Sequence, residues 1–170
     1  MMINTKWCFP EDLLTKSLAV MKPHGVRGNE GLALWLGRED EGIVAITHVV
    51  SVVGRGVRGA PLQLRLSLAC MEAITNLADR VESYLVGQIH SHPARMLDLS
   101  EVDRIHGIRI QNYLSLVCPC YAQLATLSIE ECGVHLFDRG SYRRLHDEEV
   151  RSRIHLSHDR ADLMTLEVDA

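Results

Sequence analysis

A buried strand that ends in histidines and a proline constrains this chain more than any other feature. The segment SYLVGQIHS, residues 83–91, is apolar and β-rich enough to form a buried strand. Pro93 ends this strand, because proline cannot donate to a sheet ladder. Side chains of a strand alternate between its two faces, so His90 and His92 point the same way. The pattern predicts two imidazoles side by side at one strand end, where they can hold a single metal ion.

The residues that follow bring a carboxylate back to the same place. Residues 93–99 are long enough to turn the chain, Ser100 is a typical helix N-cap, and Asp103 falls in the first helical turn. Ser-x-x-Asp also resembles a capping box that only satisfies free N–H groups, and His-x-His alone is a weak signal. Taken together, the four positions predict a zinc site with three protein ligands and an open fourth position for water, as in catalytic zinc sites.

Other zinc motifs are absent from the sequence. The chain contains no His-Glu-x-x-His helix, which excludes the metalloproteases that use that motif. A zinc deaminase needs His-x-Glu and a later Pro-Cys-x-x-Cys, whereas Cys118-Pro119-Cys120 has the wrong spacing. These two cysteines are more typical of a buried strand end, because free cysteine packs as a small hydrophobe.

The rest of the chain predicts a single α+β domain with a mixed central β-sheet flanked by helices. Amphipathic helices are expected at residues 10–25, 67–81, 100–114 and 147–156. Apolar strands are expected at residues 31–37, 42–52, 62–66, 83–91, 114–118, 124–130, 132–138 and 141–145. The stretch REDEG reads as a turn between two hairpin strands, and residues 54–60 as a glycine-rich loop without the Lys-Ser/Thr ending of a phosphate-binding loop. The domain is expected to span residues 1–160, followed by a polar, disordered tail at 161–170.

Charge and composition exclude several function classes. A net charge of -4 and a pI near 6.1 argue against nucleic-acid binding, which usually requires a basic patch. No apolar run approaches the roughly 20 residues that span a membrane, and the N-terminus lacks a signal-peptide pattern. Five cysteines follow no disulfide framework, which fits a reducing cytoplasm. A cytoplasmic protein without a membrane or nucleic-acid partner is therefore expected.

The residues of the predicted zinc site resemble the JAMM motif of the JAB/MPN zinc metalloprotease family. His90-Ser91-His92-Pro93, the spacing to Ser100 and Ser100-x-x-Asp103 match that motif, and Glu30 in GNEGLALWLG stands where the family places a glutamate. The family often has two glycines after this glutamate, whereas here Gly31 is followed by Leu32. The resemblance covers most of the chain and is strongest at residues 87–103. It implies a single JAB/MPN domain with a cytidine-deaminase-like topology.

The resemblance also implies a role for each site residue. His90, His92 and Asp103 are expected to bind one Zn²⁺ per chain, Glu30 to act as general base, and Ser100 to stabilise an oxyanion. Zinc lowers the pKa of a bound water to roughly 7, and a nearby carboxylate can take its proton and return it to a leaving amine. Spacing alone does not select Glu30, because the residues at 39–41 are also acidic, although they lie in the apparent turn. His106 is either a surface residue or a hydrogen-bond partner of a ligand.

The function that the resemblance implies is hydrolysis of an amide or isopeptide bond without a covalent intermediate. The chain is similar to stand-alone prokaryotic, deubiquitinase-like JAB proteins, some of which accompany antiphage systems. The expected partner is a ubiquitin-like protein with a Gly-Gly-type tail, together with its conjugating or activating enzymes. Two alternatives stay open: a peptidase that trims a ubiquitin-like sulfur-carrier protein for cysteine or cofactor biosynthesis, and a non-catalytic MPN scaffold.

Overall fold

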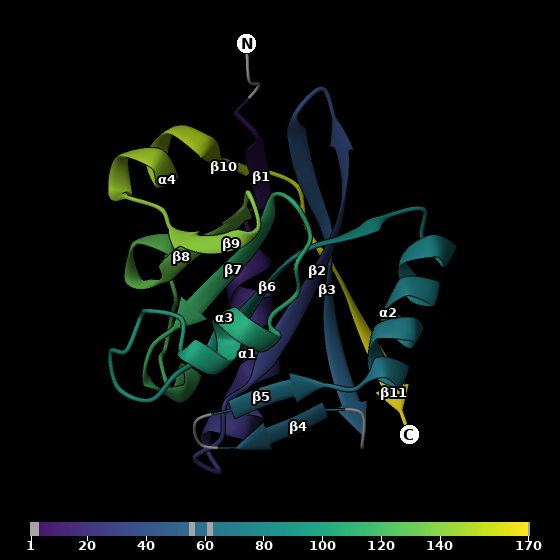
Figure 1. Ribbon diagram of the computed structural model, residues 1–170, viewed down its shortest axis with the longest axis vertical. Coiled ribbons are helices and arrows are strands. Elements are labelled where there is room, and N and C mark those ends of the chain that lie inside the picture. Colours follow the sequence, from purple (N-terminus) through teal and green to yellow (C-terminus); the bar gives the residue numbers. More distant parts are fainter. Residues whose placement is uncertain (1–3, 55–56, 61–62, 170) are drawn as a thin grey trace.

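The computed structural model describes residues 4–54, 57–60 and 63–169, and these form an α+β fold around a nine-stranded mixed sheet (Figure 1). The strands lie in the order β10-β1-β3-β2-β6-β7-β8-β9, and β11 also pairs with β3. Their bounds are β1 Lys6–Pro10, β2 Leu32–Asp40, β3 Ile43–Gly54, β6 Tyr84–Ser91, β7 Tyr113–Cys118, β8 Gly133–Asp138, β9 Ser141–Arg144, β10 Ile154–Ser157 and β11 Asp162–Val168. A separate hairpin pairs β4 Val57–Ala60 with β5 Gln63–Leu66. The expected α+β class with a mixed sheet and flanking helices is confirmed.

Helices cover both faces of this sheet. The described helices are α1 Leu13–Gly25, α2 Leu68–Arg80, α3 Glu101–His106 and α4 Asp147–Arg153, with short 3-10 turns η1 Cys120–Ala122 and η2 Ile129–Glu131. On one face, α1 packs Leu18 and Met21 against Trp35 and Ile89 of the central strands. On the other face, α2 packs Ile74 against the alternate residues of β2, in the same layer as α3. Because the central strands are covered on both faces here, residues 32–37 of β2 and residues 89–91 of β6 are buried whichever way they point.

Two central strand pairings place the end of β6 at the middle of the molecule. β2 runs antiparallel to β6 with Leu32 opposite His90, and β6 runs parallel to β7 with His90 opposite Val117. The Leu32–His90 pair places the residues just before β2 beside the residues just after β6. Glu30 and His92 therefore meet at one edge of the central strands.

The predicted hairpin is confirmed, but its turn is tighter than the sequence suggests. β2 continues through Arg38 to Asp40 and pairs in register with the start of β3. Only Glu41 and Gly42 form the connection, with φ angles of 47° and 80°. Two residues of positive φ make the type of hairpin turn whose twist matches the strands. The charged residues expected in a loop are thus mostly exposed strand residues.

Four predicted elements need correction, because packing overrides local pattern. The helix expected at 147–156 ends at Arg153, and Ile154–Ser157 form β10. The helix expected at 100–114 ends at His106, and Tyr113 already belongs to β7. The strand expected at 124–130 is irregular, followed by η2. In the expected glycine-rich loop, Gly54 ends β3, residues 55–56 lie outside the described part of the chain, and 57–60 form β4.

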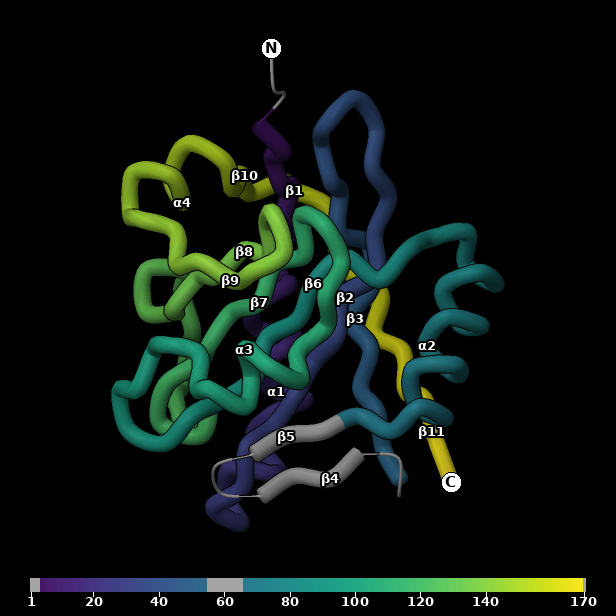
Figure 2. The backbone as a smooth tube through the Cα atoms, viewed as in Figure 1, coloured from purple at the N-terminus to yellow at the C-terminus, as the bar shows by residue number. Residues whose placement is uncertain are grey.

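The two ends of the described chain join the sheet as well. β1 had no counterpart in the sequence prediction; it pairs in parallel with β3 and β10. Within the segment expected to be a polar, disordered tail, Asp162–Val168 form β11, which runs parallel to β3 along residues 48–54 (Figure 2). Leu166 and Val168 contribute to the core beside α2, which explains why this segment is ordered. The expected boundary at residue 160 therefore does not separate a tail from the domain.

Membrane insertion through helices has no support in the structure. Among the described residues, no helix is both long enough and apolar enough to cross a membrane.

Candidate metal centre

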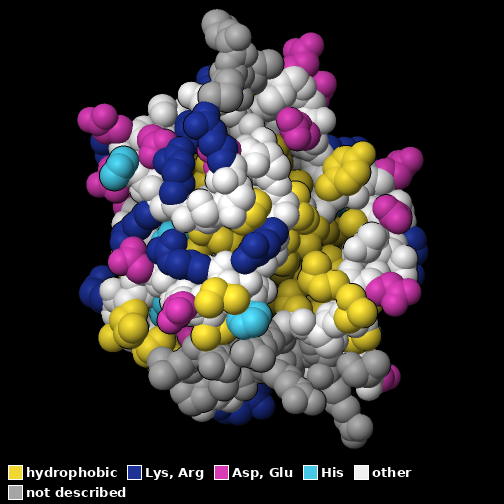
Figure 3. Space-filling view, viewed as in Figure 1, with side chains coloured by type: hydrophobic (Ala, Val, Ile, Leu, Met, Phe, Trp, Pro, Cys, Tyr) yellow, Lys and Arg dark blue, Asp and Glu magenta, His cyan; other side chains and the backbone are white. Residues whose placement is uncertain are grey.

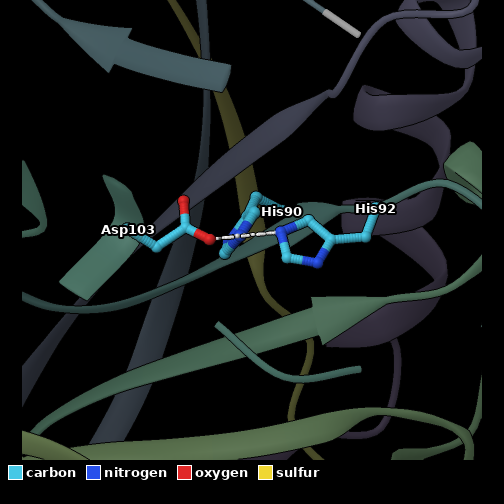
Figure 4. Close-up of side chains that lie close together, drawn as sticks. All are labelled: His90, His92 and Asp103. Atoms are coloured by element: carbon cyan, nitrogen blue, oxygen red, sulfur yellow. Dashed lines mark hydrogen bonds and ion pairs between the residues drawn. The ribbon is translucent and has the colours of Figure 1, made fainter. Parts of the chain in front are cut away.

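Three side chains converge at the end of β6 (Figure 4). His90 Nε2 lies 3.0 Å from His92 Nε2, and Asp103 Oδ2 lies 3.5 Å from the first and 3.2 Å from the second. Four-coordinate zinc with bonds of roughly 2.0–2.1 Å holds its ligand atoms about 3.3–3.4 Å apart. The three atoms already have this spacing. In the described part of the chain, this is the group of His, Cys, Asp and Glu that could hold a metal ion.

The protonation of His92 suits a metal ligand. Its Nδ1 lies 3.0 Å from the carbonyl oxygen of Met96. A carbonyl only accepts hydrogen bonds, so Nδ1 carries a proton, and Nε2, which hydrogen-bonds Asp103 here, is the ring atom that would bind a metal ion. This backbone contact comes from the loop after Pro93 and also fixes the ring's orientation. No sequence pattern indicates this contact of Met96, because it depends on the fold of that loop.

Asp103 is held by the start of α3 in a full capping box. Ser100 donates from its backbone N–H and from its hydroxyl to Asp103 Oδ2, both at 2.8 Å, and its hydroxyl accepts from the Asp103 N–H at 3.1 Å. The capping role and the ligand role therefore coexist, because the capped oxygen is the one that faces the histidines. Burial alone would raise the pKa of Asp103, but hydrogen bonds from His90 and His92 outweigh it and lower that pKa. The carboxylate stays ionised, as metal binding requires.

Glu30 lies directly beside the three converging side chains. Its Oε1 is 3.8 Å from His92 Nε2, and its side chain is 2% exposed. Burial raises the pKa of Glu30 to about 7; His92 opposes this shift, and the charge of Asp103 adds to it. Its second oxygen is buried and has no hydrogen-bond partner among the described residues. A carboxyl group with this pKa can both take and return a proton near neutrality.

The backbone around Glu30 is fixed by two close contacts. The N–H of Gly31 donates to Ser91 Oγ at 2.8 Å, which ties the start of β2 to the end of β6. A Cβ at Gly31 would stand 2.8 Å from the backbone of Met21 in α1. Only glycine allows this approach of strand and helix, so the residue after the glutamate is restricted for packing reasons.

The structure brings together all five residues predicted for the site, and it separates the competing acids from it. Glu30, His90, His92, Ser100 and Asp103 form one connected cluster. The acidic residues at 39–41 are exposed at the far end of the β2–β3 hairpin. His106 is exposed and lines a neighbouring cavity. No hydrogen bond joins it to a ligand residue within the described chain.

A cavity of about 390 Å³ opens beside the centre. His90 and Asp103 form its inner end, and its walls include Met71, Ile110 and Tyr142. A second cavity of about 460 Å³ shares Met71 and Ile110 with it and continues along α2. Hydrophobic side chains gather in the hollow between α2 and α3 (Figure 3). An extended chain of small or apolar residues could lie along this hollow and reach the centre.

A buried histidine next to the centre was not assigned from the sequence. His135 on β8 is fully buried, and its Nδ1–H donates to the Ser115 carbonyl at 3.3 Å. Its Nε2 lies 4.0 Å from Asp98, which also binds Arg144. Burial lowers the pKa of His135 to about 4, and the charge of Arg144 lowers it further, while the bond to Ser115 opposes the shift. The ring is therefore neutral in the folded protein at pH 7.

The depressed pKa of His135 predicts acid sensitivity of the metal-free protein. The unfolded chain binds a proton near pH 6.5 and the folded chain only near pH 4, so the stabilising effect of neutral His135 is lost as pH falls through this window. The loss is on the order of 3 kcal/mol at most. Denaturant unfolding between pH 4 and 7 should show a smaller decline for His135→Gln than for the wild type. The exposed His155→Gln should follow the wild type, and parallel curves for His135→Gln would contradict the prediction.

Comparisons with known proteins support the fold and no more. No protein-family model matches the chain, and no curated protein matches it in sequence. Among solved structures, the solution structure of protein DSY2949 from Desulfitobacterium hafniense is similar, with a TM-score of 0.62 over 90% of this chain and 94% of that chain. The two sequences are 18% identical. The likeness therefore concerns the fold alone.

Proposed function

We propose that the protein is a zinc-dependent peptidase of the JAB/MPN type. The proposal is carried by one observation: His90, His92 and Asp103 converge at metal-ligand spacing, with Glu30 3.8 Å from His92. A bound zinc ion supplies a Lewis acid that activates water and polarises a carbonyl oxygen. Three protein ligands of the N and O type leave a coordination position open, as catalytic sites do.

The chain's own residues provide the remaining chemistry. Glu30 takes a proton from the attacking water and delivers it to the leaving nitrogen. The backbone N–H of Ser100 holds Asp103 in place. The Ser100 hydroxyl donates its single proton to Asp103 Oδ2 in this structure, and we assign it to turn towards the carbonyl oxygen of a bound substrate and stabilise the negative charge that develops there. The hydrophobic walls around the centre exclude bulk water and so strengthen these electrostatic interactions. The reaction is hydrolysis of an amide without a covalent enzyme intermediate.

The substrate that fits the hollow beside the centre is an extended tail of small residues. A buried centre at a strand end is out of reach of an amide within a folded core, so the scissile bond lies in an exposed segment. We assign this segment to the C-terminal tail of a ubiquitin-like protein, cleaved after its terminal glycine. Such a tail binds through its backbone, and small residues allow it to pass close to the metal.

Metal content tests the catalytic proposal against a non-catalytic scaffold. We expect the purified protein to contain one zinc ion per chain by elemental analysis, and to cleave a ubiquitin-like fusion with a short C-terminal extension. A scaffold would purify without stoichiometric metal and would leave the fusion intact. That result would reject the proposed activity.

The tail assignment predicts strict selection for small residues before the cleaved bond. Replacing the penultimate glycine of the modifier by leucine or tryptophan should reduce cleavage at least ~10²-fold, because a bulky side chain clashes beside the metal. A gel assay with the same replacement on a distant surface of the modifier serves as control. Equal cleavage of glycine-tailed and bulky-tailed substrates would contradict the assignment. So would efficient hydrolysis of unrelated unfolded peptides, which would indicate a general peptidase.

A further inference from the structure

A third cavity, of about 370 Å³, lies beside Glu30 on the side of α1. Glu30 and Leu32 belong to its lining, and Leu32 also lines the cavity that contains His90 and Asp103. The two cavities therefore share Leu32 at the start of β2, and Glu30, which lines one of them, lies 3.8 Å from His92. The other described lining residues come from the end of α1, the α1–β2 turn and the end of β3.

The position of Glu30 assigns the two cavities to the two sides of the cleaved bond. In the proposed hydrolysis the amide C–N bond breaks and a bond forms between the carbonyl carbon and the water oxygen. The proton that Glu30 takes from water passes to the leaving nitrogen. The leaving nitrogen must therefore lie on the side of Glu30. The cavity that Glu30 lines receives the leaving group, and the cavity lined by His90 and Asp103 holds the acyl side.

The outer part of the Glu30 cavity is suited to an anion. Arg27 is exposed at this cavity, and no acidic residue other than the buried Glu30 is among its described lining residues. The side chain of Asn29 adds neutral hydrogen-bonding capacity. The cavity thus has the buried carboxyl of Glu30 on its inner side and the exposed guanidinium of Arg27 on its outer side.

The turn that carries these residues is firmly built. The N–H groups of Arg27 and Asn29 both donate to the His24 carbonyl, at 3.0 and 3.1 Å, and Gly28 adopts a φ of +70° that favours glycine. The Gly25 carbonyl accepts from the Gly28 N–H at 2.9 Å. These donors satisfy the last carbonyls of α1, so the negative end of that helix opposes an anion less than an uncapped end would.

We infer that this cavity binds the leaving segment and that Arg27 binds the C-terminal carboxylate of that segment, an inference that rests on the proposed function. The preferred substrate is then a precursor with a short C-terminal extension. An extension of a few residues ends in a carboxylate within the cavity, and a guanidinium binds a carboxylate through two parallel hydrogen bonds. A lysine side chain of a folded protein brings no such carboxylate, so it uses the cavity less well.

Binding measurements on a protein that cannot turn over test this assignment. The Glu30→Gln variant is titrated with two fluorescent peptides that end in Gly-Gly-Ala-Ala, one with a free carboxylate and one with a carboxamide. We expect the free acid to bind about tenfold more tightly, as a charge-assisted hydrogen bond provides. Adding Arg27→Gln should remove this difference, and Arg27→Lys should keep part of it because the charge remains. Arg80→Gln, at an exposed arginine of α2, is the matched control and should change nothing.

The outcomes separate this inference from the proposed function. Equal affinities for acid and amide, no binding of either peptide, or equal weakening of both by Arg27→Gln would overturn the role of Arg27. Tighter binding of a branched lysine isopeptide would assign the cavity to a lysine side chain and overturn the inference. Arg27-dependent selectivity for the free acid, together with no hydrolysis by the wild-type protein, would support the cavity assignment and reject the proposed peptidase activity.

Discussion

Replacing His92 by alanine is expected to remove bound zinc and all hydrolysis together. His92 contributes one of three converging ligand atoms, and its ring is already aligned by the Met96 carbonyl. Loss of this ring leaves His90 and Asp103, and two ligands do not make a stable zinc site. The same change removes the imidazole that lies 3.8 Å from Glu30 Oε1. Elemental analysis of the purified variant should find little zinc, and the fusion substrate should remain intact.

The exposed His155 provides a matched control for this experiment. His155→Ala should keep full zinc content and full activity, because this residue lies on β10 at the sheet edge. Circular dichroism of both variants checks that the fold is retained. Full zinc occupancy in His92→Ala would show that the metal is held elsewhere and would reject the ligand assignment.

The convergence of His90, His92 and Asp103 was predictable because its geometry is mostly local. Strand alternation places His90 and His92 on one side, and the N-cap position of Ser100 fixes Asp103 in the first turn of α3. Only the loop at 93–99 had to close correctly, and its closure is restrained by Pro93. The four residues that predict the site, His90, His92, Ser100 and Asp103, therefore lie within less than 20 residues of sequence.

Glu30 was not predictable on the same physical grounds. It lies 60 residues before His90, and the sequence shows other acids nearby at 39–41. The register of β2 against β6 decides between them, because Leu32 opposite His90 brings Glu30 to the centre and carries Glu39 away from it. Strand register depends on tertiary packing, so the residues alone leave the choice open, and the family resemblance had to supply it.

The errors in the fold prediction have the same origin. Residues 107–112 continue a helical pattern, but the chain leaves α3 at Gly107, where a Cβ would stand 2.3 Å from the Asp103 carbonyl. Residues 162–168 are polar enough to resemble a tail, yet they pair with β3, and Met164, Leu166 and Val168 pack into the core beside α2. The cavity near Arg27 combines two segments that are separate in sequence, residues 20–32 and 51–54, which no local pattern could indicate.

The Glu30→Gln variant should separate metal binding from chemistry. Glutamine keeps the size of the side chain beside His92 but cannot accept the proton of water. The three ligand residues are untouched, so we expect zinc content and tail binding to match the wild type. Turnover should fall by at least ~10²-fold, the lower end of what general acid–base catalysis contributes.

The comparison with Glu41→Gln decides whether this loss is specific. Glu41 lies in the exposed hairpin turn, and the same substitution there should leave turnover unchanged. Single-turnover kinetics with saturating enzyme isolates the chemical step from substrate binding and product release. Near-wild-type turnover of Glu30→Gln would mean that another group moves the proton. The burial of the Glu30 carboxyl and its raised pKa would then need a structural explanation. A purely structural role does not account for them, because one of the two oxygens has no hydrogen-bond partner among the described residues. A carboxyl group that is buried although one of its oxygens lacks a hydrogen bond is typical of a catalytic site rather than of a packing role.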